Sequence, residues 1–166
     1  KFINAADESE VIFTSGTTES INMFAQGVEH MILPGDEVVV TVAEHHSNFV
    51  PWQQITQKLH AQFTVITDDL SLTKNNITSH INKNTKVLAI THVSNVFGTV
   101  NPIKAIVTEA RKINPNIIIL VDAAQSAPHI RIDVQDLGCD GLAFSSHKLC
   151  GPTGVGVLWV KKTLLE

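Results

Sequence analysis

The sequence is poor in several residues that mark whole classes of protein. Two of its 166 residues are cysteines, Cys139 and Cys150, which are too few for a disulfide framework and whose spacing matches no zinc motif. Charged residues make up 17% of the chain, its formal net charge is −4, and its longest basic run is Lys161-Lys162. It therefore carries no signature of nucleic-acid or acidic-membrane binding. No apolar stretch of about 18 residues predicts a membrane span and no signal peptide is visible. We expect a cytoplasmic protein.

Apolar material, in contrast, is plentiful. Hydrophobic residues make up 43% of the chain, which is enough for one sizeable core. We therefore expect a single domain over residues 1–166. Because the chain opens without Met and stops at an apparent helix start at 162–166, we also expect it to be truncated at both ends.

Strand-like apolar runs alternate with segments of helical spacing along the chain. The run at 116–121 is apolar almost throughout, which is typical of a strand buried on both faces in a parallel sheet. The alternation predicts an α/β fold, a three-layer α/β/α arrangement with a mainly parallel central sheet. The predicted strands are 11–13, 37–42, 62–66, 86–92, 116–121, 140–144 and 156–160, and the predicted helices cover 21–28, 50–59, 72–81 (capped by 70–73) and 102–113.

Polar residues gather where these strands end. Open α/β sheets bind ligands at the carboxyl ends of their strands, so clusters on successive strands point to one crevice. The sequence therefore predicts a small-ligand site at that edge. The clusters lie at residues 14–19, 44–46, 94–95, 122–125 and 145–148.

Lys148 lies between two apolar runs, in a stretch rich in hydroxyls and glycine. A lysine held there is partly removed from water, which favours the neutral, nucleophilic amine that a Schiff-base lysine needs. Taken alone, a lysine in this position could equally be a solvent-facing loop residue. The other clusters favour the chemical interpretation.

The run Ser15-Gly16-Thr17-Thr18-Glu19-Ser20 joins a predicted turn to a predicted helix. Backbone N–H groups and hydroxyls at a helix N-terminus suit a phosphate, and so does the helix dipole. The same pattern fits an ordinary N-cap with Glu19 in the first helical turn. It is not a P-loop, because the Gly-Lys-Ser/Thr ending is missing.

Asp122 ends the most apolar strand, where a carboxylate is costly without a cationic or N–H partner. It either pairs with a protonated heterocycle or caps the next turn, and Gln125 could reach the same ligand. His45 and His46 directly follow another strand. We expect one of them to be a flat ring or an acid/base group and the other a structural cap, and no metal site.

A lysine amine, a phosphate cradle, a carboxylate for a pyridinium nitrogen and a flat histidine are the parts of a pyridoxal phosphate site. Here the chain resembles the fold-type I, class V aminotransferase-like enzymes, and within them the cysteine desulfurase/selenocysteine lyase group of the SufS kind. The Glu-His-His-x-Asn-x-Val-Pro-Trp-Gln run beginning at Glu44 particularly favours this group. The matching stretches, in the family's order, are residues 15–22, 44–53, 92–99, 121–126 and 145–154.

The resemblance implies a role for each matching position. Lys148 forms the Schiff base with pyridoxal phosphate and later moves the α-proton of the substrate. Asp122 pairs with the pyridine nitrogen, and Gln125 hydrogen-bonds the phenolate oxygen. His45 stacks on the ring and is a candidate acid/base group. The remaining implied contacts are Thr17, Thr18, Ser145 and His147 to the phosphate and Asn95 near the substrate carboxylate.

The implied parent enzyme is a homodimeric cysteine desulfurase. It removes sulfur from L-cysteine, leaving alanine, and passes the sulfur as a persulfide to an acceptor protein for iron–sulfur cluster assembly. The family's nucleophilic cysteine and its carboxylate-binding arginine have no counterpart in this chain, and we expect Cys139 and Cys150 to be ordinary buried thiols. Two alternatives stay open: a selenocysteine lyase or other class V lyase, and a non-catalytic cofactor-binding module.

Overall fold

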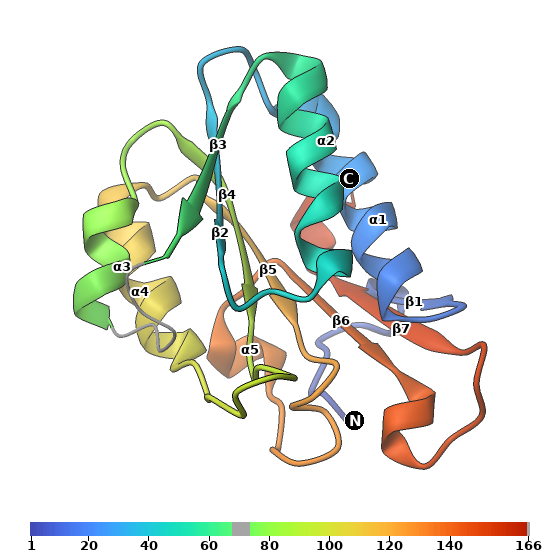
Figure 1. Ribbon diagram of the computed structural model, residues 1–166. Coiled ribbons are helices and arrows are strands. Elements are labelled where there is room, and N and C mark those ends of the chain that lie inside the picture. Colours follow the sequence, from blue (N-terminus) through green and yellow to red (C-terminus); the bar gives the residue numbers. More distant parts are fainter. Residues whose placement is uncertain (68–73, 166) are drawn as a thin grey trace.

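The computed structural model describes residues 1–67 and 74–165 of the chain. A seven-stranded sheet runs through the middle, in the order β1-β7-β6-β5-β4-β2-β3, with helices on both sides (Figure 1). The strands are β1 (Val11–Thr14), β2 (Glu37–Thr41), β3 (Gln62–Ile66), β4 (Thr85–Thr91), β5 (Ile118–Asp122), β6 (Gly141–Ser145) and β7 (Gly156–Val160).

Helices cover the two faces of this sheet in separate groups. Helices α1 (Thr17–Val28) and α2 (Val50–Leu59) pack on one face. The other face is covered by α3 (Lys74–His80), α4 (Ile103–Ile113) and α5 (Val134–Leu137). Each face has its own apolar core, so the predicted three-layer α/β/α fold is confirmed.

Strand direction explains where a ligand site can form. Pairings β2–β3, β2–β4, β4–β5 and β5–β6 are parallel, while β7 runs antiparallel to both β6 and β1. The sheet is therefore mainly parallel, as predicted. The carboxyl ends of β1, β2, β4, β5 and β6 share one edge. Strand β5 is buried along its whole length, as its apolar sequence indicated.

Several short elements were not predicted from the sequence. They are α5 and the single-turn 3-10 helices η1 (Glu8–Glu10), η2 (Glu29–Met31), η3 (His46–Asn48) and η4 (Ser146–Leu149), and a further single turn, η5, covers Lys162–Leu164. The helix start expected at 162–166 is the single turn η5. The cap expected at 70–73 lies outside the described residues. Within residues 1–67 and 74–165, no helix has the length and apolarity needed to cross a membrane.

Gly141 fixes how closely α1 approaches the sheet. A Cβ at this position of β6 would lie 2.3 Å from the ring of Phe24 on α1. Gly27, also on α1, has nothing within 4 Å of its ideal Cβ. Replacing each glycine by alanine therefore separates the effect of a close contact on stability from the effect of an added methyl group alone.

We expect Gly141→Ala to lower the free energy of unfolding by about 1–3 kcal/mol, the usual cost of overpacking a core. Gly27→Ala serves as the matched control and should be neutral or stabilise by up to about 1 kcal/mol, because alanine is the better helix former. Urea unfolding followed by circular dichroism measures both. Equal stabilities for the two variants would contradict the assigned Phe24 contact.

Candidate active site

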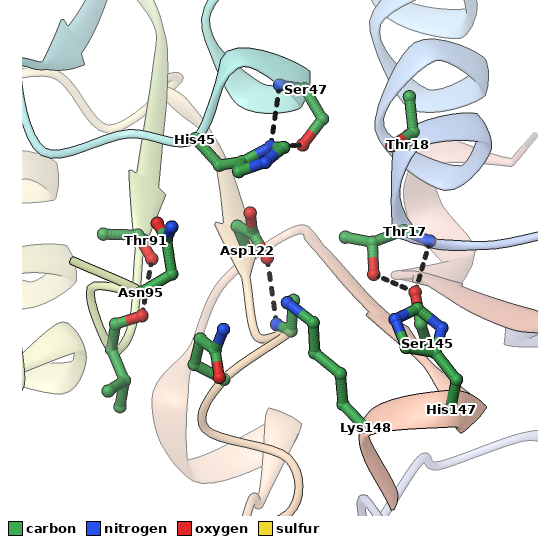
Figure 2. Close-up of a pocket in the computed structure, with 13 residues that line it drawn as sticks. Thr17, Thr18, His45, Ser47, Thr91, Asn95, Asp122, Ser145, His147 and Lys148 are labelled. Carbon is green, nitrogen blue, oxygen red and sulfur yellow. Dashed lines mark hydrogen bonds between the residues drawn. The ribbon is translucent and has the colours of Figure 1, made fainter. Parts of the chain in front are cut away.

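One cavity of about 280 Å³ lies at the carboxyl edge of the sheet (Figure 2). It receives side chains from the α1 N-terminus and from the segments that follow β2, β4, β5 and β6. All nine residues predicted for the ligand site line it: Thr17, Thr18, His45, Asn95, Asp122, Gln125, Ser145, His147 and Lys148. The structure thus brings together residues up to 131 positions apart in the sequence, from Thr17 to Lys148.

The N-terminus of α1 forms one wall of the cavity. The backbone N–H of Thr17 donates to Ser145 Oγ at 2.7 Å, and the two hydroxyls lie 2.5 Å apart. Both residues are buried, and they join α1 to the end of β6 (Figure 2). The positive end of the helix dipole and these hydroxyls face the same space, which suits an anionic group such as phosphate.

Two glycines allow this wall to form. A Cβ on Gly156, at the start of β7, would lie 2.5 Å from the Gly16 backbone, so neither chain segment could yield by moving a side chain. Gly156 also pairs with Ser145 across the β6–β7 ladder. The turn before α1 is therefore held directly against the strand that positions Ser145.

Asp122 forms the floor of the cavity at the end of β5 and is only 4% exposed. Its Oδ1 accepts a hydrogen bond from the Ala124 N–H at 2.9 Å, so it caps the following turn as one of the two sequence interpretations proposed. Burial raises the pKa of this carboxyl, while the charges of Lys148 and His45 oppose the rise. Asp122 is a buried acid that a cationic ligand group would hold ionised.

Lys148 reaches the cavity from η4, the single turn after β6. The residue is partly buried, and its side chain extends toward Asp122 (Figure 2). The turn closes at Cys150, whose φ of 60° places it in the left-handed region. An amine and a carboxylate therefore face each other across a space large enough for a small ligand.

His45 forms the opposite wall, on the segment after β2. Its Nδ1 lies 3.1 Å from Ser47 N and 2.7 Å from Ser47 Oγ. The ring of His46 stands edge-on at 6.2 Å from that of His45, and His46 does not line this cavity. Of the two histidines considered from the sequence, His45 is the one that lines this cavity. It is also the N-cap of η3.

The rim of the cavity is open to solvent. Thr18, Asn95 and His147 are exposed, and Gln125 is partly buried. The buried floor is therefore suited to holding a ligand in one orientation, while the rim leaves access for a second molecule.

Four residues that line the cavity were not among the predicted site residues: Ser47, Thr91, Val93 and Ala124. Glu44, the residue before His45, was not among them either. A serine two residues after a histidine at the start of a turn, and a threonine at the end of a parallel strand, were the available signals. Glu44 was visible only as part of a polar cluster.

Glu44 ties three chain segments together. Its Oε1 accepts from Thr41 Oγ1 at 2.7 Å and from the Thr91 N–H at 3.0 Å, and its Oε2 accepts from Asn48 Nδ2 at 2.7 Å. Asn48 Oδ1 in turn accepts from Trp52 Nε1 at 3.2 Å. This network joins the ends of β2 and β4 to the turn that carries His45.

The carboxyl of Glu44 is abnormally weak as an acid. The residue as a whole is only partly buried, but its oxygens are turned inward onto Thr41, Asn48 and Thr91. Burial, together with a smaller contribution from the negative charge of Asp122, raises its pKa to about 8 against the opposing effect of its hydrogen bonds. Glu44 therefore binds a proton more strongly than a free glutamate does.

Neither cysteine belongs to the cavity lining. Cys139 is 1% exposed, and burial raises the pKa of its thiol to about 12, so it is an unreactive core residue as expected. The expectation of a buried thiol is wrong for Cys150, which is exposed. The reason is local: Cys150 ends η4 in the left-handed conformation rather than entering a strand or helix that packs on the core.

Comparison with known proteins identifies the class to which this fold and site belong. The aminotransferase class-V family matches the chain over residues 1–166. The chain is therefore a member of this family.

Two similar proteins and one similar structure are named as cysteine desulfurases, the first of them as a probable one. The chain is 48% identical to a probable cysteine desulfurase of Halalkalibacterium halodurans over 169 residues, covering 100% of this chain and 41% of that relative. It is 45% identical to a cysteine desulfurase of Yersinia pseudotuberculosis over 170 residues, covering 99% and 41%. The crystal structure of the cysteine desulfurase CsdA from Escherichia coli superposes with a TM-score of 0.93 at 40% identity, covering 99% and 42%. The chain thus spans about two fifths of the relatives it matches.

We expect the stability of the chain to fall as pH rises, because of Glu44. A pKa raised from 4.5 to about 8 in the folded state means that the folded chain binds more protons than the unfolded chain between those values. The resulting stability is fully present below pH 4.5 and is lost as pH rises to about 8, and it amounts to a few kcal/mol, on the order of 1.4 kcal/mol per pKa unit.

Urea unfolding of the wild type and Glu44→Gln at several pH values isolates this effect. The wild-type advantage over Glu44→Gln should shrink as pH rises through that window, because the amide does not titrate. Glu109→Gln on the surface of α4 is the control and should show little change. A wild-type advantage that is constant with pH would show that Glu44 ionises normally.

Proposed function

We propose that this chain is the pyridoxal phosphate-binding large domain of a cysteine desulfurase. The observation that carries the proposal is the convergence of Lys148, Asp122 and His45 with the α1 N-terminus around one cavity. The named activity of the relatives supports it. So does the similar structure of C-DES with glycine covalently linked to the PLP cofactor, which matches at 25% identity and a TM-score of 0.87.

The residues present fit this cofactor chemically. Asp122 is a buried acid that faces the cavity and lacks a cation within hydrogen-bond distance among the described residues, and a protonated pyridine nitrogen would supply one. Lys148 would hold the cofactor covalently through Nζ. When bound, pyridoxal phosphate supplies an electron sink for the negative charge that develops on the amino acid substrate.

The remaining side chains of the cavity would contact different parts of the cofactor and the substrate. Thr17, Thr18, Ser145 and His147 would hold the phosphate at the α1 N-terminus, where backbone N–H groups and the helix dipole favour an anion. His45 would stack against the ring and Gln125 would donate to its phenolate oxygen. Asn95, exposed on the rim, would lie near the substrate carboxylate.

Lys148 would also move a proton. Its Nζ would be placed to take a proton from the substrate and to return it. Asp122 would hold the ring nitrogen protonated, and the cationic nitrogen would in turn favour the ionised carboxylate.

The parent enzyme in this proposal acts on L-cysteine. It forms a homodimer in the cytoplasm and passes sulfur to an acceptor protein, as the SufS-type resemblance implies. Among the described residues that line the cavity there is neither a cysteine nor an arginine. The sulfur-accepting thiol and the substrate-carboxylate clamp would therefore come from outside the cavity lining seen here.

Covalent trapping tests the proposed cofactor. We expect pyridoxal phosphate added to the purified chain to be fixed by borohydride onto the peptide that contains Lys148, as measured by peptide mass spectrometry. Lys148→Ala should lose this adduct. Lys112→Ala, which removes an exposed lysine of α4, should keep it. An adduct spread over surface lysines, or unchanged in Lys148→Ala, would refute the assignment.

We also expect the 166-residue chain with pyridoxal phosphate to release no sulfide from L-cysteine beyond the rate of the free cofactor. The physical reason is the lack of a thiol and of an arginine in the described cavity lining, with Cys139 buried and its pKa raised to about 12. A sulfide assay measures this directly. Repeated turnover by the chain that disappears in Lys148→Ala would contradict the expectation and place the complete reaction within these residues.

A further inference from the structure

Ser47 makes two contacts with the same ring nitrogen of His45. Its backbone N–H donates to Nδ1 at 3.1 Å, and its Oγ lies 2.7 Å from that atom (Figure 2). A hydroxyl can either donate or accept, so the second contact alone does not reveal where the ring proton lies.

The backbone contact resolves this ambiguity. A peptide N–H is only a donor, so the Nδ1 that receives it must present its lone pair. A proton on Nδ1 would point at the Ser47 N–H. With Nδ1 as the acceptor, the Ser47 hydroxyl is a second donor to it, and the neutral ring carries its proton on Nε2.

The local fold holds this arrangement in place. His45 is the N-cap of η3, with φ −67° and ψ 149°, and Ser47 lies in the following turn, so the contact is built from the cap itself. Glu44 anchors the same turn through Asn48. No hydrogen bond joins His45 Nε2 to any residue that the structure describes, and His45 lines the cavity together with Asp122 and Lys148.

We propose that Ser47 is a positioning residue that holds His45 in the Nε2–H tautomer, so that the neutral ring presents a proton rather than a lone pair to the cavity. A neutral His45 that accepted a proton at Nε2 would first have to move its own proton to Nδ1, lose the contact from the Ser47 N–H and reverse the contact with the Ser47 hydroxyl. The consequence for chemistry rests on the proposed function: between the two acid/base roles, His45 is set up to donate. The tautomer itself does not depend on a bound cofactor.

Nitrogen NMR of the histidine rings tests the tautomer directly. The 166-residue chain is labelled with ¹⁵N-histidine and measured without cofactor at a pH where the rings are neutral, with His45→Gln to assign the signals. We expect His45 to show a protonated Nε2 and an unprotonated Nδ1. Ser47→Ala removes the hydroxyl but keeps the N–H, and it should leave His45 in the Nε2–H tautomer, because the hydroxyl can serve either tautomer and the N–H only one.

The outcomes separate cleanly. A protonated Nδ1 in the wild type would overturn the proposal, and so would a shift to Nδ1–H in Ser47→Ala, which would show that the hydroxyl and not the N–H selects the tautomer. If Ser47→Ala fails to fold by circular dichroism, the wild-type tautomer still decides, because it is measured in the unaltered chain. Failure of cofactor trapping on Lys148 would count against the proposed function and leave this result unchanged.

Discussion

The site depends on a carboxylate that is buried at the end of the central strand. Strand β5 is enclosed on both faces by helical layers, so Asp122 lies where water cannot solvate it well. A single N–H bond from Ala124 compensates only part of that cost. The charges of Lys148 and His45 stabilise the ionised form from two other segments of the chain, after β6 and after β2. Holding Asp122 ionised therefore requires the sheet order that brings those segments to one edge.

Glu44 is a second acid close enough to interact with Asp122, and the two carboxyl groups have different electrostatic surroundings. Glu44 sits behind His45 with its pKa raised to about 8, partly by the negative charge of Asp122. Asp122 has the cationic Lys148 nearby, whereas the partners of Glu44 are the neutral donors Thr41, Thr91 and Asn48. The environment thus favours a charge on Asp122 more than on Glu44, whose hydrogen bonds anchor a turn.

Periodicity predicted much of this fold because parallel strands leave strong apolar signals. The bounds of β3 and β7 match the predicted runs 62–66 and 156–160. Helix α1 begins at Thr17, earlier than the expected 21, because its first turn is polar and serves the cavity instead of the core. The shared edge of the strands also explains why the polar clusters at their ends line one cavity, whereas the nine individual residues were selected from the resemblance to the family. Cys150 was assigned wrongly because a left-handed residue after a single helical turn leaves no periodic trace.

The features that escaped prediction all depend on where a side chain or N–H group points. Sequence order places Ser47 beside His45, but only the cap geometry shows its N–H and hydroxyl converging on Nδ1. Thr91 contacts Glu44 through its backbone N–H. Any residue type at this position could make that contact, so the sequence carries no signal of it. The contacts of Ser47 bear on which nitrogen of His45 carries its proton, while burial raises the pKa of Glu44 against its hydrogen bonds. Residue types at the strand ends therefore indicate the class of chemistry, while the protonation of the groups that carry it depends on burial and on donors in the adjoining turns, which only the folded structure shows.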